Sequence, residues 1–331
     1  MDMQAFTSAL TRNPLSALKG AKPMKAFSLA ALTLLSVALS ACGTSLTETP
    51  IASDTELSSQ AVLPNVSGFV TYIHFNGLTG KNQIVRANQQ NDQKTILLET
   101  SYNNSPGSVA SSKDGKTVVY SLSGDIFRRV GSATTNITNN AAQKNYNVSV
   151  SADGKRVAWE RNEGSKRVVT VRTYTTNGFS QVTLPASVSQ YNPSISGNGK
   201  FVALTRTVNN QNQILRYTLA SNSYTTVYTT SNSVRSPSPS NSNKLGWTEQ
   251  TGSNYQLRSK VIGSSVKTHF SSDRYIGHSN MTADGKYMTY DFYEYVSGDT
   301  KYMVVTRDLA SGKTAKLAYD SHNFKEPFWQ K

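Results

Sequence analysis

Histidines and turn aspartates are the side chains of this chain whose types could support acid–base or metal chemistry. The four histidines are His74, His269, His278 and His322. They are too scattered for an HExxH motif or another paired metal motif. The sequence also contains no Gly-x-Ser-x-Gly nucleophile motif and no Asp-x-Asp-x-Asp calcium loop. We therefore predict no catalytic residue, no metal site and no cofactor.

Three aspartates stand in short polar turns, each directly before a glycine: Asp114, Asp153 and Asp284. Asp-Gly pairs favour the positive φ that a tight turn between antiparallel strands requires. Turn formation therefore explains these carboxylates, and we expect them to be structural.

The single cysteine, Cys42, ends a segment that has the pattern of a secretory signal. Lys25 supplies a short positive region, and an apolar stretch follows from Ala26 to Leu39. This stretch is shorter than the ~20 apolar residues that span a bilayer, so we expect it to be removed. Leu39-Ser40-Ala41-Cys42 resembles the bacterial lipobox, which implies cleavage before Cys42 and its acylation. An ordinary signal peptide with an incidental cysteine is the alternative.

The first part of the chain therefore divides into two predicted segments. Residues 1–41 form the signal segment, in which Met1 and Met24 are both candidate starts. Residues 42–64 are rich in Ser and Thr and form a flexible tether. Two or three acyl chains, at ~0.8 kcal/mol per buried CH₂, would hold Cys42 stably on a membrane. We expect a bacterial envelope protein whose folded part, residues 65–331, lies outside the cytoplasm.

A polar turn recurs through residues 65–331. Its five copies are Ser112–Lys116, Ser151–Lys155, Ser196–Lys200, Ser240–Lys244 and Thr282–Lys286. Their fourth positions hold glycine, or asparagine at Asn243, and are spaced 39, 45, 44 and 42 residues apart. This spacing is close to the ~40 to 45 residues of a four-stranded propeller blade. Each turn precedes an alternating strand, and no helical period follows the signal segment, so we predict an all-β propeller.

The two ends of the repeated region complete the ring of blades. Residues 68–75, 83–87 and 95–98 make three strands that lack an innermost strand before them. Residues 327–329 match the position of an innermost strand and can supply it. Pairing of the last strand with the first blade would close the ring and remove exposed sheet edges. We therefore predict six blades.

The repeat Pro-x-aromatic-Ser-x-Asp-Gly-Lys resembles that of the TolB-like β-propellers, over about residues 65–331. These propellers also occur beside hydrolase domains in prolyl oligopeptidases, but no such domain is visible in this sequence. The family's proline before Asp-Gly is replaced in every copy, and its tryptophan survives only as Trp329. The resemblance implies the fold, while the departures set this chain apart from the subgroup that works with the Tol system.

Large aromatic and cationic side chains gather in the loops that enter the innermost strands. They are Tyr102, Tyr146, Tyr191, Arg235, Tyr275, His278, Phe324 and Lys325. We expect them to ring one mouth of the channel, where Tyr and Arg could anchor a peptide or a sugar. The predicted binding residues are Tyr146, Tyr191, Arg235, His278 and Lys325. The alternative is that Tyr146 and Tyr191 occupy a consensus packing position between blades.

His278 is the histidine best placed to face the channel, since it begins an innermost strand. Some pectate-degrading lyases with related propellers hold a metal by histidines near the axis. A polar surface histidine is the simpler interpretation here, because only His322 could lie on the same face.

The chain of 331 residues carries 34 Lys+Arg against 20 Asp+Glu, a formal net charge of +14. Its lysines are spread through turns, and no nucleic-acid-binding module is visible. We expect a solvated basic surface, no nucleic-acid partner and a monomer. The function we predict is a lipid-anchored, non-catalytic binding or scaffold protein for an envelope protein or glycan. An enzyme of the polysaccharide lyase or hydrolase type, with a site in the channel, is the alternative.

Overall fold

Six four-stranded antiparallel sheets follow one another along the chain. The computed structural model of the protein describes residues 68–88, 93–139, 143–296, 299–320 and 324–330. All of them belong to the unit Pro50–Lys331, and they form strands and turns without a helix. The predicted all-β class is confirmed. A search of the described residues finds no helix with the length and apolar character needed to cross a membrane.

The first three sheets, or blades, contain the following strands. Blade 1 holds β1 (Phe69–Asn76), β2 (Lys81–Asn88), β3 (Lys94–Ser101) and β24 (Phe324–Gln330). Blade 2 holds β4 (Ser108–Ser111), β5 (Thr117–Leu122), β6 (Asp125–Val130) and β7 (Ala133–Asn136). Blade 3 holds β8 (Asn145–Val150), β9 (Arg156–Glu163), β10 (Lys166–Thr175) and β11 (Gly178–Thr183).

The remaining blades have the same order of strands. Blade 4 holds β12 (Gln190–Ile195), β13 (Phe201–Val208), β14 (Gln211–Thr218) and β15 (Ser223–Thr230). Blade 5 holds β16 (Ser233–Pro239), β17 (Lys244–Thr251), β18 (Asn254–Val261) and β19 (Val266–Ser272). Blade 6 holds β20 (Ile276–Met281), β21 (Tyr287–Val296), β22 (Asp299–Asp308) and β23 (Thr314–Asp320).

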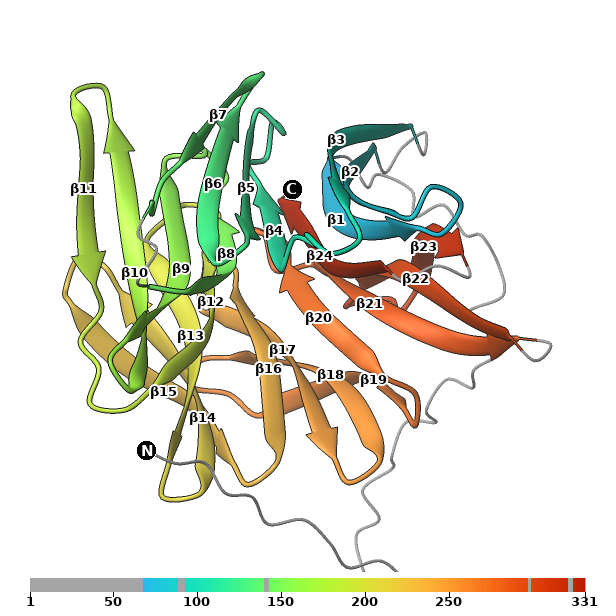
Figure 1. The fold of residues 1–331 in the computed structure, drawn as a ribbon. Helices are drawn as coiled ribbons and strands as arrows, with labels where there is room; N and C mark the ends of the chain where they lie inside the picture. Colours follow the sequence, from blue (N-terminus) through green and yellow to red (C-terminus); the bar gives the residue numbers. More distant parts are fainter. Residues whose placement is uncertain (1–67, 89–92, 140–142, 297–298, 321–323, 331) are drawn as a thin grey trace, which may run out of the picture. The chain divides into compact units, whose positions relative to one another are not determined.

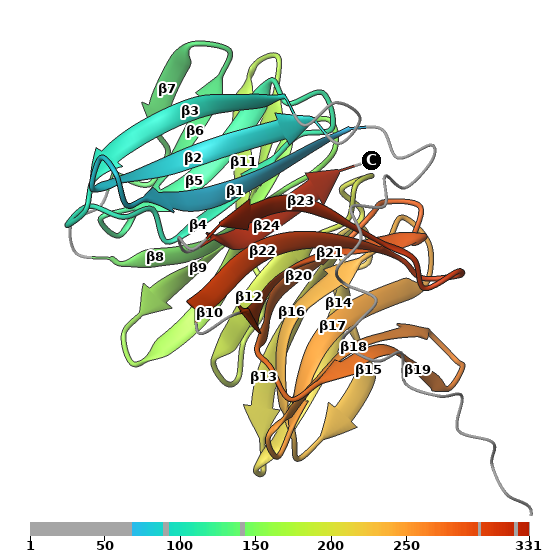
Figure 2. The same ribbon diagram turned by 90° about the vertical axis from the view of Figure 1, so that its right-hand side faces the viewer.

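The innermost strands of the six blades form a closed ring. Each contacts the innermost strand of the next blade, in the order β4, β8, β12, β16, β20, β24 and β4 again. Figure 1 shows these strands around a common centre with the later strands of each blade outside them. Figure 2 shows neighbouring blades fanned beside one another. The six-bladed propeller predicted from the repeat is confirmed.

Blade 1 is completed from the two ends of the repeated region, as predicted. Strand β24 pairs antiparallel with β1, so that Val70 lies opposite Trp329 and Thr71 opposite Phe328. The Thr71 hydroxyl also donates a hydrogen bond of 2.8 Å to the Ser111 hydroxyl of blade 2. The last strand of the chain therefore closes the ring.

The repeated turns are built as their sequence predicts. Their glycines have positive φ, between 66° and 70°, at Gly115, Gly154, Gly199 and Gly285. In the first copy the Ser112 hydroxyl donates to Asp114 Oδ1 at 2.6 Å, and the Lys116 N–H donates to the same oxygen at 3.0 Å. Asp153 and Asp284 make the same pair of contacts. Their expected structural role is confirmed.

The turn of blade 5 differs from the prediction. The Ser196 N–H donates to the carbonyl oxygen of Phe201, five residues later, whereas the Ser240 N–H donates to that of Lys244, four residues later. The turn is thus one residue shorter, and Asn243 does not occupy the glycine position. Lys244 instead begins the second strand of its blade, in the place that Phe201 has in blade 4.

The core lies between adjacent blades. One cluster joins Ala110 and Val119 of blade 2 to Val150 and Trp159 of blade 3.

Candidate functional site

The five predicted binding residues lie on the innermost strands of five successive blades. Tyr146, Tyr191, Arg235, His278 and Lys325 belong to β8, β12, β16, β20 and β24. All are near the end at which these strands begin, which we call the mouth. The opposite end, with the repeated turns, we call the turn face. The first four side chains are partly exposed, and the Lys325 side chain lies outside the described residues. The same is true of Phe324, His322 and Cys42.

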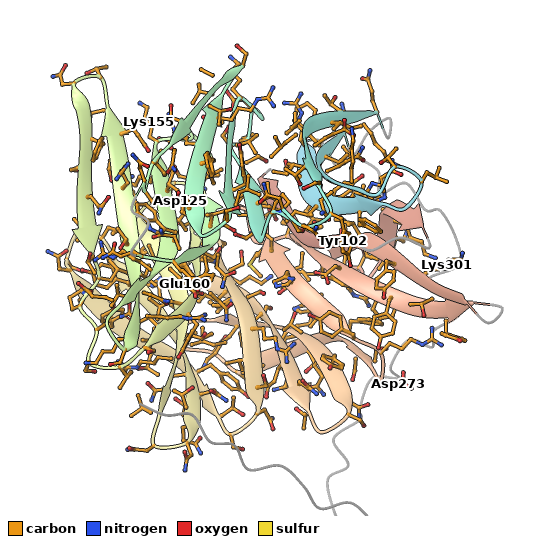
Figure 3. The ribbon with its side chains drawn as sticks, in the orientation of Figure 1. Tyr102, Asp125, Lys155, Glu160, Asp273 and Lys301 are labelled. Carbon is orange, nitrogen blue, oxygen red and sulfur yellow. The ribbon has the colours of Figure 1, made fainter. Side chains whose placement is uncertain are left out.

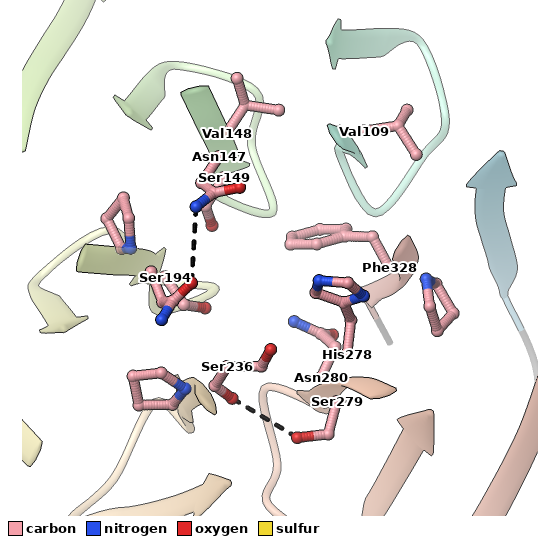
Figure 4. A pocket seen from close by; sticks show the side chains of 14 residues that line it. Val109, Asn147, Val148, Ser149, Ser194, Ser236, His278, Ser279, Asn280 and Phe328 are labelled. Carbon is pink, nitrogen blue, oxygen red and sulfur yellow. Dashed lines mark hydrogen bonds between the residues drawn. The ribbon is translucent and has the colours of Figure 1, made fainter. Parts of the chain in front are cut away.

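A bulge follows Tyr146, Tyr191 and Arg235, and His278 itself lies within the bulge of β20. The register with the second strand shifts between Tyr146 and Val148, and between Tyr191 and Ser194. The bulged residues Asn147 and Asn192 have φ of 41° and 53°. Asparagine tolerates this left-handed conformation better than most residues. Both asparagines line the channel, and Asn147 Nδ2 lies 3.4 Å from Asn192 Oδ1. Figure 4 shows the Asn147 side chain beside the channel cavity.

A fully buried carboxylate, Glu160 of β9, holds this part of the mouth. Its Oε1 accepts hydrogen bonds from Asn147 Nδ2 at 2.6 Å and from the Asn192 backbone N–H. Its Oε2 is 3.2 Å from Arg167 Nη1. Burial raises the pKa of Glu160, against the opposing effects of these hydrogen bonds and of the Arg167 charge. Figure 3 shows Glu160 well apart from Lys155, which lies in the turn before β9 at the turn face.

Two of the predicted residues pack on the partner of this carboxylate. The Arg167 guanidinium carbon lies 4.7 Å from the ring centroid of Tyr146 and 5.5 Å from that of Tyr191. Both distances are typical of cation–π contacts. The two tyrosines therefore have a packing role between blades 3 and 4, in keeping with the alternative interpretation. They are also partly exposed, so packing leaves each ring a surface at the mouth.

On the blade 6 side of the mouth, Asp291 holds the start of β20. Its Oδ1 accepts a hydrogen bond of 2.6 Å from the His278 backbone N–H and lies 3.5 Å from His278 Nδ1. A Cβ at Gly277 would lie 1.8 Å from Asp291 Oδ2, so only glycine leaves space for this carboxylate. Burial, and then the Asp291 charge, raises the pKa of the Tyr275 phenol, which also shares a hydrogen bond with Arg235.

Tyrosines gather beside this second group. The Tyr275 ring packs edge-on against Tyr255 at 5.3 Å and is stacked on Tyr293 at 6.1 Å. Tyr293 in turn contacts Tyr302 at 6.0 Å. Aromatic pairs in these geometries add about 0.5–1.5 kcal/mol each beyond area burial. The mouth over blades 5 and 6 therefore has a rigid aromatic wall.

Below the mouth, the channel holds a small cavity of about 60 Å³ lined by innermost-strand residues. Figure 4 shows His278, Asn280 and Phe328 on one side of it and Asn147 and Ser149 on the other. Pockets for small molecules usually measure about 300–1,000 Å³. The channel therefore accommodates a few waters, and a sugar or peptide would have to bind at the mouth.

Channel serines link the blades. The Ser149 hydroxyl accepts the Ile195 N–H at 2.9 Å, and the Ser238 hydroxyl accepts the Met281 N–H at 2.8 Å. Ser194 occupies the same position in blade 4. The residue of blade 5 that would donate to it, in the position of Ile195 and Met281, is Pro239, which has no N–H. Among the described residues, the buried Ser194 hydroxyl has no hydrogen-bond partner.

Sequence reasoning missed Glu160 and Asp291, although both stand six residues after a turn glycine. Aligning the second strands as well as the turns would have placed both carboxylates at one level of the ring. Within the described residues, no group of three His, Cys, Asp or Glu side chains could hold a metal ion.

Comparison with known proteins reveals similarity of fold. No family model matches the chain, and no curated protein matches it in sequence. TolB from Acinetobacter baumannii superposes with a TM-score of 0.63 at 19% identity, over 80% of this chain and 67% of that one. A putative TolB from Agrobacterium tumefaciens gives 0.59 at 16%, over 78% and 91%. A chain of a nidogen–laminin complex gives 0.59 at 12%, over 79% and 98%. The fold is thus that of the TolB-like six-bladed propellers.

Proposed function

We propose that this protein is a non-catalytic binding module that holds a protein or glycan partner at its mouth. The observation that carries the proposal is the shared position of Tyr146, Tyr191, Arg235 and His278. These partly exposed aromatic and cationic side chains come from four successive blades and meet at one end of the ring. Tyr and Arg are the side chains that most often dominate binding energy at interfaces.

The construction of the mouth favours binding. Glu160 and Asp291 are buried and hold the bulges of β12 and β20 by hydrogen bonds to backbone N–H groups. Side chains that are already ordered lose little entropy when a partner docks, so more of the contact energy appears as affinity.

We propose further that the protein is anchored in a bacterial envelope by acyl chains on Cys42. The support is the signal pattern of residues 1–41 and the lipobox that ends at the single cysteine. A tether such as residues 42–64 would let the propeller reach a partner above the membrane surface.

An enzyme with a site at the channel remains the alternative function. The observation in its favour is the pairing of His278 with Asp291 at the channel opening, since a carboxylate can orient a histidine for acid–base work. The alternative predicts cleavage of an acidic polysaccharide by the purified protein and loss of that cleavage in His278→Ala.

The binding proposal is tested by crosslinking in intact cells. A photoreactive residue at Tyr191 should give one dominant adduct, whereas the same residue at Lys155 on the turn face should give little. Sensitivity of the adduct to protease or to glycan-degrading enzymes distinguishes a protein partner from a glycan. The same dominant adduct from Lys155, with none from Tyr191, would overturn the proposal.

A further inference from the structure

A larger cavity, of about 560 Å³, opens on the turn face between blades 5 and 6. This volume lies within the ~300–1,000 Å³ that is usual for small-molecule sites. Its charged and titratable lining residues are Lys244, Lys260, Lys267, His269, Lys286 and Asp308. The walls come from β17, β18 and β19 of blade 5, and from the turns of blade 6. The cavity is thus separate from the mouth.

Positive charge in this cavity is not balanced. The Lys260 ammonium points to blade 4, where it donates to the Val227 carbonyl at 3.0 Å. The other three lysines, Lys244, Lys267 and Lys286, outnumber two nearby carboxylates, which are Asp308 in the lining and Asp284, whose charge opposes the lowering of the Lys244 pKa. No described carboxylate lies within 4.0 Å of these three ammonium groups. Asp308 is itself engaged, because its Oδ1 accepts the N–H groups of Ala310 and Ser311 at 2.8 and 3.0 Å. Lysines that outnumber the carboxylates around a cavity favour an anionic ligand.

The shortened turn of blade 5 explains why Lys244 belongs to this group. The lysines of the other turns, such as Lys200, are exposed, whereas Lys244 begins β17 and is partly buried. Its Nζ donates to the Gly285 carbonyl at 2.7 Å. Burial, and then the Lys267 charge, lowers the pKa of Lys244. An ammonium has three hydrogens, so Lys244 keeps two donors for a ligand.

Uncharged groups form part of the wall. His269 Nε2 lies 2.8 Å from the Ser259 hydroxyl, and His269 also hydrogen-bonds to the backbone of Leu309. Burial, followed by the charges of Lys267, Lys244 and Arg307, lowers the pKa of His269 to about 4. The imidazole is therefore neutral at physiological pH and adds no charge to the cavity.

We propose that this cavity binds a phosphate-bearing ligand larger than a single phosphate ion. Lysine ammonium groups act as compact point charges for phosphate oxygens. Three separate ammonium groups around about 560 Å³ suit two phosphoryl groups, or one phosphoryl group with its attached body. The source is either a soluble phosphorylated molecule or a phospholipid headgroup.

Calorimetry with pyrophosphate tests the site on the full chain. The salt concentration should be about 150 mM, where contacts between exposed charges are largely screened. The variant is Lys267→Gln with Lys286→Gln, because both side chains are exposed and their ammonium groups make no hydrogen bond to a described residue. We expect the pyrophosphate Kd to rise by about tenfold or more, as loss of charge-assisted hydrogen bonds implies.

A matched control removes the same charge from the same face. Lys155→Gln with Lys200→Gln changes two exposed turn lysines of blades 3 and 4. We expect its Kd to stay within about twofold of the unchanged protein. Equal weakening by both double variants, or no pyrophosphate binding by the unchanged protein, would overturn the proposal.

Vesicles distinguish the two sources of phosphate. The full chain with Cys42→Ser, which cannot be acylated at that position, is sedimented with vesicles of phosphatidylcholine alone or with added phosphatidic acid. Binding to the phosphatidic acid vesicles that Lys267→Gln with Lys286→Gln removes supports a headgroup ligand. Pyrophosphate binding without such vesicle binding supports a soluble phosphorylated ligand.

Discussion

Glu160 of blade 3 accepts a hydrogen bond from the backbone N–H of Asn192, which lies 32 residues later in blade 4. A single buried carboxylate therefore ties two blades together at the level of the mouth. The same oxygen accepts from the Asn147 side chain, so both bulges depend on Glu160. The shape of the candidate binding surface therefore depends on a buried charge that lies beneath it.

Replacing this carboxylate should destabilise the protein and loosen the mouth. In Glu160→Ala, Arg167, whose side chain is 41% exposed, loses its ion-pair partner, and the half-buried Asn192 N–H loses its acceptor. We expect the free energy of unfolding to fall by about 2 kcal/mol, the scale of charge-assisted hydrogen bonds lost from partly buried groups. Urea denaturation measures it. The control Glu163→Ala, at a side chain that is 55% exposed, should change stability by less than about 0.5 kcal/mol. Equal losses in both variants would contradict the role of Glu160.

Deleting residues 326–331 should expose the edge of blade 1. A few residues at a chain end are normally dispensable, but here they include most of β24 and its pairing with β1. We expect a marked fall in melting temperature or aggregation, measured by calorimetry and light scattering. Deletion of residue 331 alone is the control. A chain without residues 326–331 that melts like the full chain would show that β24 does not close the ring.

The propeller could be predicted because its signal is repeated. An Asp-Gly or Asn-Gly turn recurs about every forty residues and marks where an innermost strand ends. Residues 327–329 occupy the position of the innermost strand in blade 1. The fourth turn misled the alignment, because Asn243-Lys244 imitates the Gly-Lys of the other copies. Only the hydrogen bond from Ser240 to Lys244 reveals that this turn is one residue shorter.

The sequence predicted where the mouth lies but not which contacts hold its side chains. Alignment of the repeats placed Tyr146 and Tyr191 where the chain enters the innermost strands, and both lie near the start of these strands, in β8 and β12. Arg167, which both rings contact, belongs to the third strand of blade 3 and stands in no motif. A buried carboxylate such as Glu160 has no local pattern either, since its partners come from different blades. Such contacts form only in the folded structure, so no regular spacing in the sequence predicts them.

Stability should depend on His269 between about pH 6.5 and pH 4. The folded pKa is lowered to about 4, whereas an unfolded histidine titrates near its ordinary value of 6.5. Between these values the unfolded chain binds more protons, so stability is present above pH 6.5 and is lost as pH falls toward 4. We expect this loss to be about 2 kcal/mol, allowing for partial solvent exposure. In His269→Gln, urea denaturation across this range should show a correspondingly smaller loss. An unchanged pH profile would contradict the prediction.

Cys42 should carry the membrane anchor. If the lipobox is processed, the protein extracted from membranes begins at Cys42 and carries added acyl mass, and intact-mass spectrometry measures both. Cys42→Ser should abolish the acyl mass and release the chain from membranes, because no thiol remains to accept a lipid. An unmodified product cut at another position would contradict the anchor.

Binding at the mouth should depend on Tyr191 and Arg235 together. Both are partly exposed and lie on neighbouring innermost strands, so a partner seated on the mouth would contact both. In Tyr191→Ala with Arg235→Ala, capture of the crosslinked partner should weaken by ~2 kcal/mol or more if they are binding hot spots. The control, Lys155→Ala with Lys200→Ala, alters the turn face only. Circular dichroism and melting temperature separate lost contacts from lost folding, because Tyr191 also packs on Arg167. A mouth variant that melts well below the control would favour a packing role for Tyr191, and a control that abolishes capture would assign binding to the turn face.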